Sequence, residues 1–246
     1  MSTAILDDLQ AEQDRLDAIL EGLDDGAWRS PSAAAGWSVA DVVLHLAQSE
    51  EAVTASAVRD ADLGRPAAGE RASVDDVAEW MVQAERAEPS VVFDRWRTAR
   101  RASLAALRGA DPDARLRWVA SPLRPATLAT TRLAEHWAHG LDITGPLGIP
   151  FPDTERLRHI AWLAHRTLPY AFGLGGDTAG DVYCELSAPD GATWRYGSSG
   201  ARSTITGPAG AFCRVAAQRL RPEEADLVAT GPHGAAALRV LRTYAG

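Results

Sequence analysis

Apolar residues recur every three or four positions along the first part of the chain, which is the period of an amphipathic α-helix. Residues 4–24 show this pattern first, with acidic residues between the apolar ones. The same period returns over 39–53, over 73–107 and over 127–143. We therefore predict long helices in these four ranges. Pro89 is a candidate break in the third, because proline disrupts the interior of a helix.

Two of these helices carry a start signal. Ser38 stands directly before the second helix, with Asp41 three residues later, and Ser73 and Asp76 repeat this arrangement in the third. A serine at this place accepts a hydrogen bond from a backbone N–H that the first turn leaves free. A connection containing glycine and proline, near 63–70, separates the two helices.

The pattern changes after the fourth helix. The prolines and glycines of "TGPLGIPFPD" end it, and a further helix is expected over 153–172. Beyond it, "DVYCELSAPDGATWRYG" is typical of a β-hairpin, because β-branched and aromatic residues flank the turn pair Asp190-Gly191. The remaining segments are a strand, a helix that opens with proline, a short apolar stretch and a last helix, at 202–207, 208–220, 225–231 and 234–244.

These elements predict an all-helical part over 1–150 and a smaller α+β part over 175–246, with 151–174 holding the helix that bridges them. A chain of 246 residues with 46% hydrophobic content suits one large domain or two modest ones with packed cores.

Charge and composition narrow the class of partner. A formal net charge of −8 argues against nucleic acid, whose binding depends on a basic surface that neutralises phosphates. The first residues carry Asp and Glu where a signal peptide needs a basic start, and no run approaches the ~20 apolar residues of a membrane span. We expect a cytoplasmic protein, a monomer or homodimer, that acts on a small molecule and binds neither nucleic acid nor membranes.

Two residue types limit the chemistry further. Cys184 and Cys213 lie far apart with no Cys-x-x-Cys or Cys/His spacing, so we expect two buried thiols rather than a disulfide or a zinc knuckle. The chain contains no lysine, which excludes a P-loop lysine, a pyridoxal Schiff base and a lysine nucleophile.

The segment "LAEHWAHGLD" concentrates groups that could carry chemistry. Residues four apart share a helix face, so Glu135 and His139 stand one turn apart with Asp142 almost in line. His136 points about 100° away from that line and is excluded as a ligand. Glu135 and His139 are either an ordinary ion pair on a solvated face or two ligands of a divalent metal. His45, on the second helix, is the natural candidate for a third ligand, although a lone histidine in a helix is more often structural.

A family resemblance bears on this choice. "AAAGWSVADVVLHLAQSEEAV" followed by "TTRLAEHWAHGLDI" resembles the DinB / mycothiol-dependent maleylpyruvate isomerase superfamily. The pattern is Gly-Trp-Ser/Thr at the start of helix two, a histidine within that helix, and Glu-x-x-x-His on helix four. "GATWRYG", "ITGPAGAFCRVAAQR" and "DLVATG" are similar to an actinobacterial metal-binding branch with a sterol-carrier-like C-terminal domain. The implied fold is a DinB-like four-helix bundle followed by a small α/β sterol-carrier-like domain.

The resemblance implies that His45, Glu135 and His139 hold a divalent metal. Three ligands leave a coordination position open for water, substrate or a thiolate. Zinc is the expected metal, with iron, nickel or manganese as alternatives. Asp142 would orient a ligand imidazole from behind, or else serve as a solvated or capping carboxylate.

The implied activity is that of a mycothiol-dependent isomerase or S-transferase, with a metal-activated thiolate acting on an electrophilic small molecule. A metal-dependent hydrolase that uses bound water and a non-catalytic protein that binds metal or a small ligand are the alternatives. Arg219 matches a position where isomerase-like members carry an arginine toward the active site, either as a carboxylate clamp or as a surface residue. The remaining histidines are expected to be structural: His159, His165 and His233.

Overall fold

The computed structural model describes residues 2–58, 73–119, 121–176 and 178–243, so the connection expected near 63–70 lies outside it. The chain divides into two compact units, the first ending at Phe151 and the second beginning at Pro152. The first unit is helical and the second combines helices with a four-stranded sheet. The predicted fold class, a helical part followed by a small α/β part, is confirmed.

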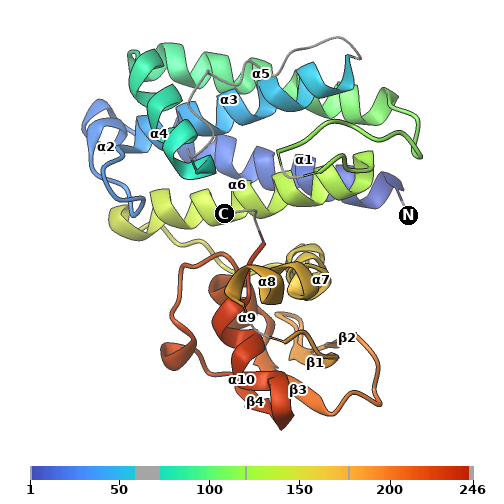
Figure 1. The fold of residues 1–246 in the computed structure, drawn as a ribbon. Coiled ribbons are helices and arrows are strands. Elements are labelled where there is room, and N and C mark those ends of the chain that lie inside the picture. The colour runs from blue at the N-terminus through green and yellow to red at the C-terminus, as the bar shows by residue number, and fades with distance from the viewer. Residues whose placement is uncertain (1, 59–72, 120, 177, 244–246) are drawn as a thin grey trace. The chain divides into compact units, whose positions relative to one another are not determined.

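The first unit is a helical bundle (Figure 1). Its elements are α1 (Ser2–Glu21), α2 (Asp25–Arg29), α3 (Val39–Ala57), α4 (Val74–Glu85), α5 (Pro89–Gly109) and α6 (Pro125–Leu147). The long helices α1, α3, α5 and α6 pack against one another. The predicted range 73–107 is two helices, because Pro89 takes the first helical position of α5, where no N–H partner is needed.

Both predicted start signals are present as reciprocal caps. The Ser38 hydroxyl accepts from the Asp41 N–H, while the Asp41 carboxylate accepts from the Ser38 N–H. Ser73 and Asp76 make the same exchange at the start of α4. Each box satisfies donors that a helix start would otherwise leave free.

The end of α6 differs from the expected stop. The helix runs through Pro146 to Leu147 and ends at Gly148, whose φ of 65° is left-handed. Proline has no N–H for the carbonyl four residues earlier, so the Asp142 carbonyl is available and accepts from the Ala33 N–H at 2.8 Å. The proline therefore permits a link between α6 and the loop that precedes α3.

Apolar side chains from all four long helices form the core of this unit. Its buried members include Leu16, Leu20, Val43, Leu46, Trp96 and Ile143. Their burial holds α3 and α6 in one packed bundle. Within the described ranges, no helix combines the length and apolar character that a membrane crossing requires.

The second unit contains one mixed β-sheet and the helices that pack with it. Its helices are α7 (Leu157–Arg166), α8 (Leu168–Gly175), α9 (Ala209–Ala216) and α10 (Gly231–Val240), with a 3-10 turn at Pro222–Glu224. Its strands are β1 (Val182–Ser187), β2 (Thr193–Tyr196), β3 (Ser203–Pro208) and β4 (Val228–Thr230). The strand order is β2-β1-β3-β4, in which β1 and β3 are parallel and the other pairs antiparallel. The predicted hairpin is β1 and β2, and Gly191 supplies the left-handed turn residue with φ of 85°.

The helix expected over 153–172 is two helices that meet at Thr167. Pro169 lies in the first turn of α8 and cannot donate the N–H that would continue α7. The Thr167 N–H instead completes α7 by bonding to the Leu163 carbonyl. Cys184 on β1 and Cys213 on α9 are fully buried free thiols, as predicted.

Candidate metal centre

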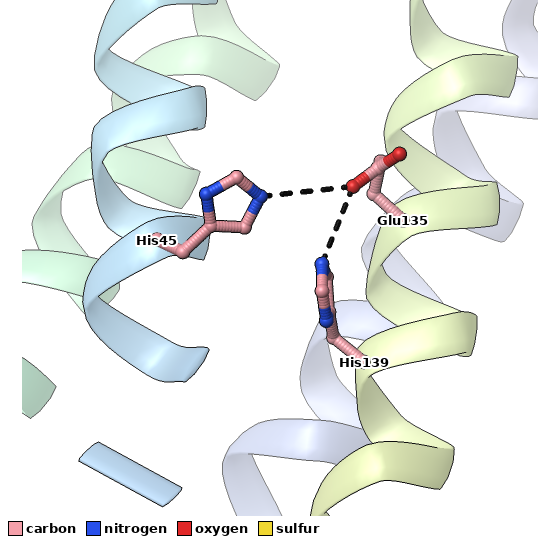
Figure 2. Close-up of side chains that lie close together, drawn as sticks. All are labelled: His45, Glu135 and His139. Carbon is pink, nitrogen blue, oxygen red and sulfur yellow. Dashed lines mark ion pairs between the residues drawn. The ribbon is translucent and has the colours of Figure 1, made fainter. Parts of the chain in front are cut away.

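Two helices bring His45, Glu135 and His139 together. His45 projects from α3, while Glu135 and His139 project from successive turns of α6 (Figure 2). One potential ligand atom from each side chain lies within 4.8 Å of the other two. The i, i+4 spacing placed two of these residues on one face, and packing of α3 against α6 added the third.

The Glu135 carboxylate lies between the two imidazoles. Its Oε2 is 3.4 Å from His139 Nε2 and 3.8 Å from His45 Nε2. The two imidazole centroids are 5.0 Å apart, with ring planes 71° to one another. The cluster is largely buried but still accessible to solvent. The exposed fractions of the side chains are 18% for His45, 28% for Glu135 and 11% for His139.

Asp142 determines how His139 presents its ring. The carboxylate accepts a 2.9 Å hydrogen bond from His139 Nδ1 and is almost fully buried. An ionised carboxylate is only an acceptor, so Nδ1 carries a hydrogen and the Nε2 lone pair of the neutral ring is directed toward the cluster. Asp142 is therefore a buried carboxylate within α6 rather than a solvated one, and its role behind a metal ligand stays a prediction.

Burial and charge act against each other on the ionisation of these groups. Burial would raise the pKa of Glu135, but the neighbouring His139 and His45 and the charge of Arg132 hold that pKa well below its usual range. Burial would lower the pKa of His139, but Asp142 and Glu135 outweigh it and raise that pKa. Burial lowers the pKa of His45 despite the opposing effect of Glu135. The cluster thus joins an ionised carboxylate to two imidazoles.

This set of donors fits a divalent metal. Two imidazole nitrogens and one carboxylate oxygen suit zinc, iron, nickel and manganese alike. The buried carboxylate behind His139 supplies the outer support that metal-binding histidines usually have.

Comparison with known proteins places the chain in a family. The sequence model described as "Mycothiol maleylpyruvate isomerase N-terminal domain" matches residues 9–144, which include all three members of the cluster. The chain belongs to the mycothiol maleylpyruvate isomerase family.

Relatives and solved structures agree with this membership. Two proteins of Mycobacterium tuberculosis, from strains CDC 1551 / Oshkosh and ATCC 25618 / H37Rv, are each 36% identical over 246 residues and are described as uncharacterised. Each alignment covers 97% of this chain and 94% of the relative. Crystal structures of mycothiol-dependent maleylpyruvate isomerase and of a histidine-to-alanine mutant of it match with TM-scores of 0.62 and 0.63. They cover 95% of this chain and 94% of theirs at 14% identity, so this likeness shows a shared fold.

In this family member an aromatic side chain that received no role from the sequence lies beside the cluster. The Trp37 ring centroid is 5.2 Å from that of His45 and 6.5 Å from that of His139, the latter at an interplanar angle of 24°. Its indole N–H donates to the Glu79 carboxylate on α4. The Gly-Trp-Ser motif was the available signal, because it places Trp37 directly before the cap of α3.

His136 faces a different part of the bundle, in agreement with its exclusion as a ligand. It is fully buried, and its Nε2 accepts from the Trp96 indole N–H at 3.3 Å. Its Nδ1 donates to the Arg132 carbonyl at 2.9 Å, so both partners specify the neutral ring with hydrogen on Nδ1.

Arg219 and the three remaining histidines belong to the second unit. Arg219 follows α9 and donates from Nη1 to the Ala217 carbonyl at 2.7 Å, so its role as a clamp stays a prediction. His165 Nε2 bonds to the Val182 carbonyl at 2.9 Å, and the His233 ring lies edge-on to Phe172. His159 lies on α7.

Proposed function

We propose that the protein is a metal-dependent enzyme that uses mycothiol as a cosubstrate, either to isomerise an electrophilic small molecule or to conjugate that molecule to the thiol. The observation that carries the proposal is the convergence of His45, Glu135 and His139 within a family member whose fold is that of mycothiol-dependent maleylpyruvate isomerase. Zinc is the expected metal, and iron, nickel or manganese fit the same donors.

A bound divalent metal supplies a Lewis acid at which a thiol loses its proton near neutral pH. The chain's own residues prepare the site for it. Glu135 contributes an ionised carboxylate, and Asp142 keeps the hydrogen of His139 on Nδ1. Trp37 lies beside the two imidazoles, with its ring centroid 5.2 Å from that of His45.

The chain's own thiols are poorly suited to be the nucleophile. Burial raises the pKa of Cys184 to about 12 and also raises that of Cys213. A buried thiol with a raised pKa holds little thiolate at neutral pH. The proposed nucleophile therefore comes from the cosubstrate, and Arg219 is the proposed clamp for a substrate carboxylate.

Metal content is the first test. Elemental analysis of purified protein should find about one divalent metal per chain, and His45→Ala should lose most of it. His233→Ala is the matched control, since His233 belongs to the second unit and packs against Phe172. Metal-free parent protein that also fails to take up added zinc, iron, nickel or manganese would overturn the proposal.

Consumption of mycothiol is the second test. The metal-loaded protein is incubated with mycothiol and a panel of electrophiles that includes maleylpyruvate, and free thiol and product are followed. Thiol-dependent conversion, lost in His45→Ala, is the expected result. Conversion that proceeds without thiol would favour the hydrolase, and metal binding without any conversion would favour a binding protein.

A further inference from the structure

A buried ion pair lies beside the candidate metal centre. Arg132 Nε donates to Glu50 Oε1 at 2.8 Å, and the two side chains are 3% and 0% exposed. Glu50 belongs to α3 and Arg132 to α6. The pair therefore joins the two helices that supply the candidate ligands.

Side chains of α5 and α6 form further hydrogen bonds around this pair. The second oxygen of Glu50 accepts from the Ser103 hydroxyl of α5. The Arg132 carbonyl accepts from His136, whose other nitrogen is held by Trp96 of α5. A buried polar group is costly unless it is hydrogen bonded, and here both oxygens of the carboxylate have partners.

A buried ion pair contributes little to the free energy of unfolding, so stability is a weak explanation for this one. The cost of removing two charges from water offsets most of their attraction, and well-packed apolar replacements are often neutral or stabilising. A buried charge pair joined by a 2.8 Å hydrogen bond from Arg132 Nε to Glu50 Oε1 does, however, define one relative placement of the two helices, whereas apolar contacts tolerate sliding.

The spacing along the two helices relates this placement to the ligands. Glu50 lies five residues after His45 on α3, and Arg132 lies three before Glu135 on α6. At about 1.5 Å per residue these offsets are roughly 7.5 Å and 4.5 Å along the axes, so the pair and the cluster lie within two turns of one another.

We propose that Glu50 and Arg132 are positioning residues that hold α3 and α6 at the separation and register at which His45, Glu135 and His139 bind a metal. The inference rests on the proposed function, because it assumes that the cluster binds one. Neither residue contacts substrate or metal in this proposal. Each acts through the helix that carries it.

The test separates positioning from stability. The variant Glu50→Leu/Arg132→Met removes both charges together, so the net charge near the cluster stays the same. Zinc affinity is measured by competition with a chromophoric chelator, and urea unfolding is measured on the metal-free protein. We expect zinc to bind about 10- to 100-fold more weakly, as when an outer support of a metal ligand is lost, with the urea midpoint unchanged or higher. Zinc affinity within twofold of the parent would overturn the proposal.

A second ion pair provides the matched control. Arg100 of α5 pairs with Asp17 of α1, and neither helix carries a ligand. Asp17→Leu/Arg100→Met should leave zinc affinity unchanged, and an equal loss there would overturn the proposal by showing a general effect of core changes. Should the Glu50 and Arg132 double variant fail to fold, Arg132→Lys keeps the charge but replaces the planar Nε–H donor that bonds to Glu50, and it should still weaken zinc binding several-fold. Unchanged affinity would overturn the proposal. Failure of the parent to bind zinc would instead overturn the proposed function.

Discussion

His139 donates a 2.9 Å hydrogen bond from Nδ1 to the buried carboxylate of Asp142, one helical turn further along α6. The bond fixes the tautomer, so that Nε2 faces Glu135 and His45. Three of the four polar groups at the site thus come from one helix, at spacings of three and four residues.

Asp142→Ala should weaken metal binding, because His139 would lose both its orientation and the charge behind it. We expect the dissociation constant for zinc to rise about 10- to 100-fold. Asp142→Asn, which can still accept from Nδ1, should cause a smaller loss. Thr144→Ala is the control, since Thr144 is equally buried on α6 and its hydroxyl bonds to the Gly140 carbonyl. Equal affinities for Asp142→Ala and the parent would contradict the role given to Asp142.

His136 should make the protein less stable in mild acid. Burial is the main cause that lowers its pKa to about 4, against a usual value of 6.5. A lowered histidine pKa means that the unfolded chain binds the proton first, so this contribution is complete above pH 6.5 and is lost as pH falls through about 4. The loss is of the order of 3 kcal/mol. Urea unfolding from pH 7 to pH 4 measures it, and His136→Gln should show a shallower dependence of stability on pH than the parent.

Gly140→Ala should destabilise the bundle although alanine favours helices. A Cβ at Gly140 would come within 2.5 Å of the Phe151 ring, over which the Arg15 guanidinium stacks at 3.6 Å. Overpacking of this kind costs roughly 1–3 kcal/mol. Gly145 lies in the same helix, and no atom of the described residues lies within 4 Å of a Cβ added there, so Gly145→Ala should stabilise by up to ~1 kcal/mol. Urea midpoints that move in the same direction for both variants would contradict this explanation.

The two thiols should resist modification in the native protein. Cys184 and Cys213 are fully buried, and burial raises the pKa of Cys184 to about 12. A thiol reagent such as 5,5′-dithiobis(2-nitrobenzoate) at pH 8 should label neither residue before unfolding and both after it. The variant Cys184→Ala/Cys213→Ala should then retain any mycothiol-dependent conversion that the parent shows. Rapid labelling of the folded protein would contradict the burial of these thiols and would make one of them a candidate nucleophile.

The sequence predicted where helices start more accurately than where a proline ends them. Ser38 and Ser73 signal their helices through local hydrogen bonds, and the structure contains both caps. Pro146 was expected to end α6, yet the helix continues to Leu147, and the carbonyl that proline leaves free accepts from the Ala33 N–H, far away in the chain. The sequence shows that this carbonyl lacks its helical donor, and only the fold shows which donor replaces it.

By itself, the sequence determined α1, α3, the body of α6 and the hairpin, together with the shared face of Glu135 and His139 and the separate face of His136. These follow from the fixed geometry of single elements. The approach of His45 to that face, the burial of Asp142 and the pairing of Glu50 with Arg132 depend on how α3, α5 and α6 pack. Residues about eighty to ninety positions apart meet only when apolar burial has assembled the bundle. The tertiary structure therefore decided which polar residues of the helices form a cluster.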